Sequence, residues 1–151
     1  MKITLKRIND AVRFEASNER GHAVIVEGGR TAGGLDEAPA PTELFMMSQA
    51  ACTAVDIVEL LKKMRQPLTH LEIEAEGHRA QDQVPKIFTG IHLHYKIYGN
   101  VAPGKADKAI AMSIEKYCTI SKMIDQVAKL TYSFEIIPNA KHPDEEETYR
   151  V

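Results

Sequence analysis

The fold is decided by the run PTELFMMSQAACTAVDIV, residues 41–58, which is apolar on nearly every side. Proline is favoured at the first position of a helix, and Glu43 places a negative charge in the first turn, where the helix dipole stabilises it. A charged side begins only at Glu59, and Pro67 ends the helix. Because a helix that is apolar all round must be covered all round, the run predicts a buried central helix and favours a second copy of the chain as part of its cover.

Short strands are predicted on both sides of this helix, because apolar and polar residues alternate there. A glycine- and proline-rich loop, residues 28–41, separates the first strands from the helix. A helical pattern over residues 105–130 indicates one helix, or two that meet near Cys118. The order βββ-α-ββ-α(α)-β is α+β, unlike the regular alternation of a nucleotide-binding fold. The expected strands are 3–5, 12–16, 22–27, 71–76, 87–98 and 131–137.

Length and composition narrow the class of protein. The 151 residues fit one domain, predicted over residues 1–137, followed by a polar acidic tail over 138–151. A net charge of −2 argues against a general nucleic-acid binder. The N-terminus lacks the apolar core of a signal peptide, and no window of about 18 residues is continuously apolar. We therefore expect a cytoplasmic protein without a membrane span, whose two cysteines are reduced at rest.

The first cysteine, Cys52, lies inside the apolar helix. Free cysteine is among the most buried residue types and often only packs, so a packing role and a reactive thiol are both open here. Helical spacing places Ser48 and Asp56 one turn to either side of it. A carboxylate at that distance would oppose formation of the thiolate.

The second cysteine, Cys118, stands where the helical pattern could restart, with Lys122 one turn further on. If a helix begins there, its dipole and the lysine would both favour the thiolate; if the helix is continuous, the dipole argument disappears. On local grounds Cys118 is therefore the more acidic thiol. Spacing alone leaves open whether the two cysteines meet.

Three histidines offer an alternative chemistry. His92 and His94 share one face of a predicted strand, and His78 lies on its partner strand. Three histidines on one face could bind zinc. That face is also the predicted solvent face, with no carboxylate ligand fixed by spacing, so a set of solvated histidines is the competing interpretation.

Three segments resemble a known family. Residues 41–54 resemble the central-helix motif of the OsmC/Ohr proteins, the osmotically inducible and organic-hydroperoxide-resistance family. Residues 115–121, EKYCTIS, resemble its second cysteine motif, and the spacing between the two cysteines also fits. Residues 56–66 and 88–95 look most like the YhfA-like branch of OsmC-type proteins. The resemblance covers roughly residues 12–137.

The resemblance implies an intertwined α+β homodimer with active sites at the interface, and thiol-dependent reduction of organic hydroperoxides in oxidative-stress defence. Cys52 would be the peroxidatic thiol, which becomes a sulfenic acid, and Cys118 would resolve it as a disulfide that an external dithiol reduces. The chemistry that the resemblance implies requires no metal, flavin or haem. From the net charge and the lack of an apolar span we expect neither nucleic acid nor membrane as a partner.

One position departs from the family's pattern. The family's active peroxidases carry a glutamate ten residues before the first cysteine, paired with an arginine, whereas this chain has Thr42 there. Glu43 comes one residue late, which is about 100° around a helix. Glu43 and the loop residue Arg30 are the candidates for that pair, with Arg20 as a weaker choice for the arginine. The departure favours an alternative function, a catalytically weak dimer that binds a small hydrophobic ligand or partner at the interface pocket.

Overall fold

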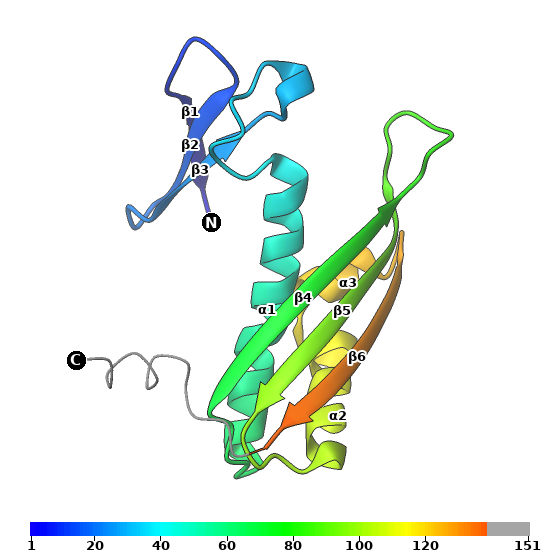
Figure 1. Cartoon of the computed structure of the whole chain (residues 1–151). Coiled ribbons are helices and arrows are strands. Elements are labelled where there is room, and N and C mark those ends of the chain that lie inside the picture. Colours follow the sequence, from blue (N-terminus) through cyan, green and yellow to red (C-terminus); the bar gives the residue numbers. More distant parts are fainter. Residues whose placement is uncertain (139–151) are drawn as a thin grey trace, which may run out of the picture. The chain divides into compact units, whose positions relative to one another are not determined.

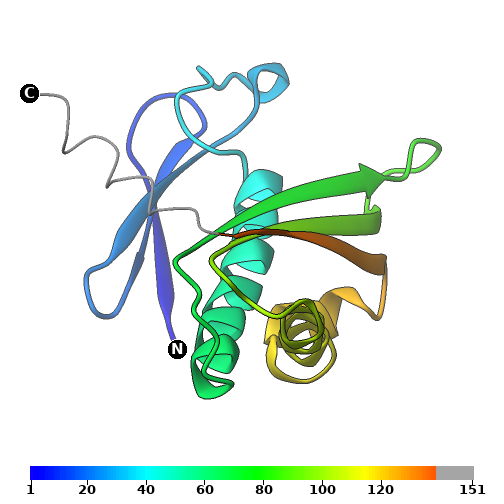
Figure 2. The ribbon, with the colours of Figure 1, turned by 60° about the horizontal axis from the view of Figure 1, so that its bottom comes forward.

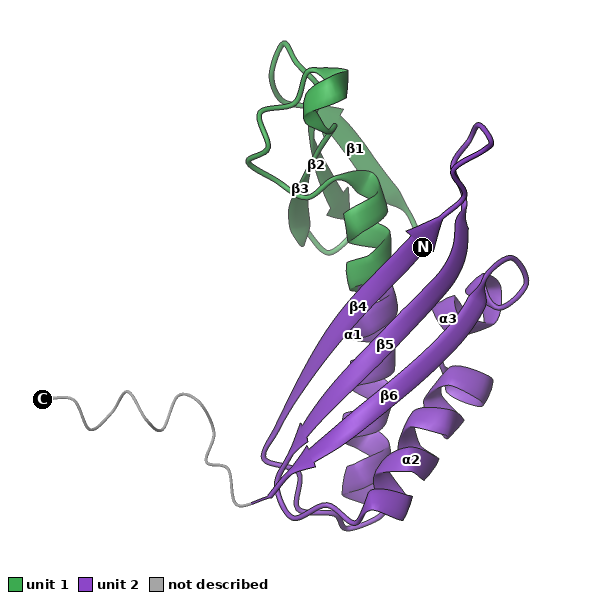
Figure 3. Cartoon of the chain, turned by 45° about the vertical axis from the view of Figure 1, so that its right-hand side comes forward, with its two compact units in different colours: residues 1–47 green, residues 48–151 purple. Residues whose placement is uncertain are grey.

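The computed structural model describes residues 1–138 of the chain, and Figure 1 follows its elements in sequence order. They form two compact units, residues 1–47 and the residues from 48 onward, which Figure 3 distinguishes by colour. Helix α1 (Pro41–Lys63) begins in the first unit and continues in the second. The single domain over residues 1–137 stays a prediction, and the acidic tail, apart from Pro138, lies outside the described residues.

The first unit contains an antiparallel sheet with the strand order β1-β2-β3. The side chains of β1 are exposed throughout, whereas β3 ends on two buried residues, Val26 and Glu27. The alternation of apolar and polar residues predicts these strands correctly, to within a few residues at their ends. The bounds are Ile3–Arg7 for β1, Arg13–Asn18 for β2 and Ala23–Glu27 for β3.

The carboxylate of Glu27 organises the glycine-rich segment that follows β3. It is 1% exposed and accepts hydrogen bonds from the backbone N–H groups of Glu37, at 2.9 Å, and Leu35, at 3.1 Å. These bonds, helped by the guanidinium of Arg13 at 4.0 Å, hold the pKa of Glu27 below its usual value. A short 3₁₀ turn, η1 (Arg30–Ala32), lies inside the segment. The predicted loop is thus folded around a buried charge.

The second unit contains a sheet with the strand order β4-β5-β6. β4 and β5 form an antiparallel hairpin, while β5 and β6 are parallel. Parallel neighbours need a long crossover, which α2, a π-helical turn (η2) and α3 provide. Figures 1 and 2 show α1 and α2 against the same face of this sheet. The bounds are β4 His70–Arg79, β5 Phe88–Tyr98, α2 Pro103–Met112, η2 Ser113–Tyr117, α3 Thr119–Ile124 and β6 Lys129–Ile137.

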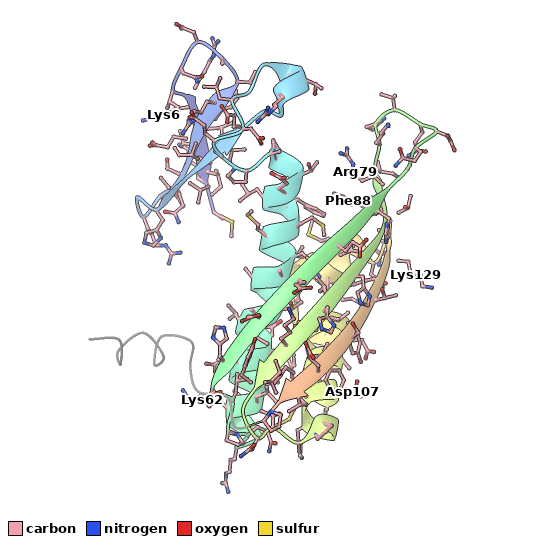
Figure 4. The ribbon with its side chains drawn as sticks, in the orientation of Figure 1. Lys6, Lys62, Arg79, Phe88, Asp107 and Lys129 are labelled. Carbon is pink, nitrogen blue, oxygen red and sulfur yellow. The ribbon has the colours of Figure 1, made fainter. Side chains whose placement is uncertain are left out.

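The core of the second unit lies between this sheet and its helices. Alternate residues of β5 point inward, as the two-residue period of a strand requires. At the turn between β4 and β5, the guanidinium of Arg79 lies 5.7 Å from the ring centre of Phe88, and Figure 4 labels both residues. The apolar core side chains of this unit that are at most 1% exposed are Ile57, Leu61, Ile91, Leu93, Tyr95, Ile97, Ala106, Ala109, Ile110 and Cys118.

Helix α1 presents two different faces. Gln49, Thr53 and Ile57 follow one another at four-residue spacing and are completely buried. Val55 and Val58 lie on another side and are 66% and 42% exposed. By length and composition α1 is the one helix within residues 1–138 that could cross a membrane, but its buried polar side chains and its place against a sheet are those of the core helix of a soluble protein.

The predicted order βββ-α-ββ-α(α)-β and the α+β class are confirmed. Of the two forms left open for residues 105–130, the structure has the divided one. The π-helical turn η2 follows α2, Cys118 is extended (φ −70°, ψ 107°), and α3 begins at the next residue. A helix therefore does start at the second cysteine.

Candidate functional site

The two cysteines come together in the second unit, although 66 positions separate them in the sequence. Cys52 is half-buried on α1, and Cys118 is completely buried at the start of α3. Their sulfur atoms and a carboxylate oxygen of Asp56 all lie within 4.8 Å of one another. Spacing could not decide whether the thiols meet; the structure brings them together.

Local structure fixes the orientation of each member of this cluster. Cys118 is the N-cap of α3, and its sulfur accepts a hydrogen bond from the backbone N–H of Ser121 at 3.3 Å. Asp56 lies one helical turn after Cys52, so both side chains project from the same side of α1. The hydroxyl of Ser113, in the π-helical turn, donates to the Asp56 carboxylate at 2.9 Å.

A buried amide, which the sequence did not single out, supports Cys118. The side-chain nitrogen of Gln49 donates to the hydroxyl of Ser121 at 2.9 Å, and the thiol of Cys118 lies 4.0 Å from the Gln49 oxygen as a long hydrogen bond. All three residues are completely buried. The signal in the sequence was a lone amide one turn before Cys52 in an otherwise apolar stretch.

The surroundings of Cys52 disfavour its thiolate. Burial is the main cause that raises the pKa of Cys52 to about 11, and the neighbouring Cys118 thiol and the negative charge of Asp56 raise it further. The backbone N–H of Ile120 acts in the opposite direction. The expectation that Asp56 opposes ionisation is confirmed.

The other two predicted site residues have local partners in the first unit. The carboxylate of Glu43 accepts a hydrogen bond from the backbone N–H of Ala40 at 2.7 Å, as a glutamate three residues after a helix N-cap does. The guanidinium of Arg30 pairs with the carboxylate of Asp36 at 3.1 Å, and both side chains are largely exposed. A role for Glu43 and Arg30 in thiol chemistry stays a prediction.

His92 and His94, on β5, use their ring nitrogens in hydrogen bonds. His92 bonds through its two nitrogens to the hydroxyls of Thr131, at 2.9 Å, and Ser133, at 2.8 Å. His94 bonds to the same Ser133 hydroxyl at 2.8 Å. Within residues 1–138, the one close group of three potential metal ligands is Cys52, Asp56 and Cys118. The histidine face is therefore not the cluster that a zinc site would need.

The sequence of the chain is similar to those of known proteins. Residues 34–133 match the sequence profile of the family described as OsmC-like protein. Protein YhfA of Escherichia coli (strain K12) is 29% identical over 129 residues, which cover 85% of this chain and 92% of that protein.

Solved structures share the fold. A hypothetical protein from Aquifex aeolicus VF5 superposes with a TM-score of 0.78 at 27% identity, over 92% of this chain and 97% of that one. The organic hydroperoxide resistance protein OhrB of Bacillus subtilis superposes with a TM-score of 0.63 at 20% identity, over 89% of this chain and 96% of that one. With a family profile that spans most of the sequence and both cysteines, the chain belongs to the OsmC-like protein family.

Proposed function

We propose that this protein reduces organic hydroperoxides, with Cys52 as the attacking thiol and Cys118 as the resolving thiol. The observation that carries the proposal is the approach of the two sulfur atoms to within 4.8 Å, on elements that are distant in sequence. A solved relative, OhrB of Bacillus subtilis, is described as an organic hydroperoxide resistance protein. The cytoplasm, where thiol reductants are abundant, is the proposed location.

The proposed reaction has three steps. The Cys52 thiolate attacks the terminal oxygen of the hydroperoxide, the O–O bond breaks, and the alkoxide leaves as the alcohol after taking up a proton, which gives a Cys52 sulfenic acid. The Cys118 sulfur then attacks the Cys52 sulfur and water leaves, which forms the disulfide. An external dithiol reduces this disulfide by exchange and is itself oxidised.

The first step needs a source of thiolate, because the residues around Cys52 raise its pKa. The family resemblance assigns that task to a glutamate–arginine pair, for which Glu43 and Arg30 are our candidates. Arg30→Gln should then lower the turnover of cumene hydroperoxide more than the same change at Arg65, an exposed arginine in the turn after α1 that is no candidate for the pair. Equal turnover in the two variants would remove Arg30 from the mechanism.

A homodimer is part of this proposal. The exposed Val55 and Val58 leave an apolar side of α1 in water in the single chain, which a second copy would cover. Light scattering should give twice the chain mass at micromolar concentration. A monomer would contradict both the dimer and a site completed by two chains.

A second candidate function also has support. The raised pKa of Cys52 fits thiols that pack rather than react, in a dimer that binds a small hydrophobic ligand. In that case both thiols should survive peroxide treatment.

The deciding experiment counts thiols. One equivalent of cumene hydroperoxide should remove two thiols per reduced chain and create one intrachain disulfide, and dithiothreitol or dihydrolipoamide should sustain turnover. Cys118→Ser should leave Cys52 as a trappable sulfenic acid, whereas Cys52→Ser should leave Cys118 nearly unreacted. A Cys118 that reacts first in the Cys52→Ser variant would reverse the roles. Thiols that persist for hours would establish the binding protein instead.

A further inference from the structure

The cluster around the cysteines has a second chemical capability, which is independent of peroxide. Its three side chains supply two sulfur donors and one carboxylate oxygen within 4.8 Å of one another. We propose that Cys52, Cys118 and Asp56 form a binding site for Zn²⁺ or a similar thiophilic cation, with the fourth coordination position left open. Sulfur together with carboxylate is a zinc donor set, whereas Mg²⁺ requires oxygen ligands.

The geometry is close to that of a tetrahedral site. With zinc–sulfur bonds of about 2.3 Å, two thiolates on one ion lie about 3.8 Å apart. The donor atoms, at no more than 4.8 Å, therefore need only small side-chain rotations to reach one ion. Cys52 and Asp56 are four residues apart on α1, the spacing at which zinc-binding helices place two ligands on one face.

Supporting hydrogen bonds already orient two of the three ligands. The Ser113 hydroxyl holds the Asp56 carboxylate at 2.9 Å, and the Ser121 N–H points at the Cys118 sulfur at 3.3 Å. Such outer partners fix ligand orientation and contribute to metal affinity. Cys52 and Asp56 are half-buried, so an ion can arrive from solvent while Cys118 closes the inner side.

Binding would require both thiols to lose their protons, so Zn²⁺ would displace about two protons per chain at neutral pH. A zinc-bound pair is unavailable for alkylation or oxidation. Conversely, a disulfide between the same cysteines removes two ligands and would release the ion. The site would therefore hold either a metal ion or a disulfide.

The test uses the reduced full-length chain and ZnCl₂ in competition with a chromophoric chelator, with MgCl₂ as the negative probe. We expect one Zn²⁺ per chain, release of about two protons per ion, and protection of both thiols from iodoacetamide. Cys52→Ser and Cys118→Ser should abolish binding. Asp56→Asn should weaken it at least about ten-fold, and Ser113→Ala should weaken it less.

The matched control removes the surface histidines. The double variant His92→Ala/His94→Ala should bind Zn²⁺ as the parent chain does. Zinc affinity that survives Cys52→Ser, or that disappears with the two histidines, would overturn the site. These readouts do not depend on peroxide turnover, so the zinc site and the proposed peroxidase can fail separately.

Discussion

Glu27 in the first unit is buried and Cys52 in the second is half-buried, yet the pKa values of the two groups move in opposite directions. The pKa of Glu27 is lowered, because two backbone N–H groups and the guanidinium of Arg13 are directed at its carboxylate. The pKa of Cys52 is raised, mainly by burial and further by a second thiol and the carboxylate of Asp56. The surroundings of Glu27 stabilise its negative charge, whereas those of Cys52 favour the protonated thiol.

The difference shows that hydrogen-bond donors and charges directed at a group can outweigh the desolvation that raises its pKa, and that without enough of them the desolvation prevails. Within the second unit, one backbone N–H, that of Ile120, lowers the pKa of Cys52 and so opposes the effect of desolvation. A reactive thiolate in this family member therefore needs a cation or a metal ion in addition to the surroundings described within the second unit. The following changes test each side of this comparison.

The largest effect should come from removing the buried carboxylate of Glu27 in the first unit, which should speed proteolysis of the segment after β3. Glu27→Ala deletes the acceptor of two backbone N–H groups and leaves the segment after β3 without its anchor. Trypsin should then cleave after the exposed Arg30 about ten-fold faster or more, because the segment opens locally. Glu19→Ala, at an exposed carboxylate in the turn between β2 and β3, is the control, since it leaves the partners of Glu27 in place. Equal cleavage rates in both variants would mean that Glu27 does not hold the segment.

A smaller effect, a loss of stability, should follow from removing the buried, uncharged amide of Gln49 in the second unit. Gln49→Ala leaves the buried hydroxyl of Ser121 without its amide partner, which should lower the free energy of unfolding by about 1–3 kcal/mol. Urea denaturation measures this change. Gln81→Ala, at an exposed glutamine in the β4–β5 turn, should change it by less than about 0.5 kcal/mol. An unchanged free energy of unfolding in Gln49→Ala would mean that the amide does not contribute to stability.

Sequence reasoning predicted the features that depend on local signals. Pro41 and Glu43 marked the start of α1, whereas the helical pattern over residues 105–130 left open whether a second helix begins near Cys118, as it does in the structure. The polar contacts of the site were not predictable in the same way. Gln49 and Ser121 are 72 positions apart, and no local pattern states which distant hydroxyl a buried amide will meet. The family resemblance, rather than periodicity, indicated that the two cysteines act together.

Both sites should also make stability depend on pH, in opposite directions. The lowered pKa of Glu27 stabilises the folded chain above the usual glutamate value of 4.5, and this contribution is lost as the pH falls through the folded-state pKa. The raised pKa of Cys52 stabilises the folded chain below pH 9.0, and this contribution is lost as the pH rises toward about 11. Urea midpoints across pH should show both slopes. Glu27→Gln should flatten only the acid slope and Cys52→Ser only the alkaline one; unchanged slopes would contradict the assignments.

The smallest effect should come from Asp56, whose charge is a minor cause of the raised pKa of Cys52. In a Cys118→Ser background, which leaves one thiol to follow, Asp56→Asn should lower the Cys52 pKa and speed its alkylation by iodoacetamide at pH 8. The gain should be less than about ten-fold, because ten-fold corresponds to a full pKa unit.

Glu59→Gln, at an exposed carboxylate on the same helix, is the control and should leave the rate unchanged. In the chain that keeps both cysteines, Asp56→Asn should weaken zinc binding. A general loosening of the site would speed alkylation in Ser113→Ala to the same degree and at every pH, whereas removal of the charge shifts the pH profile itself. A profile that does not move would show that Asp56 acts on Cys52 through packing and not through its charge.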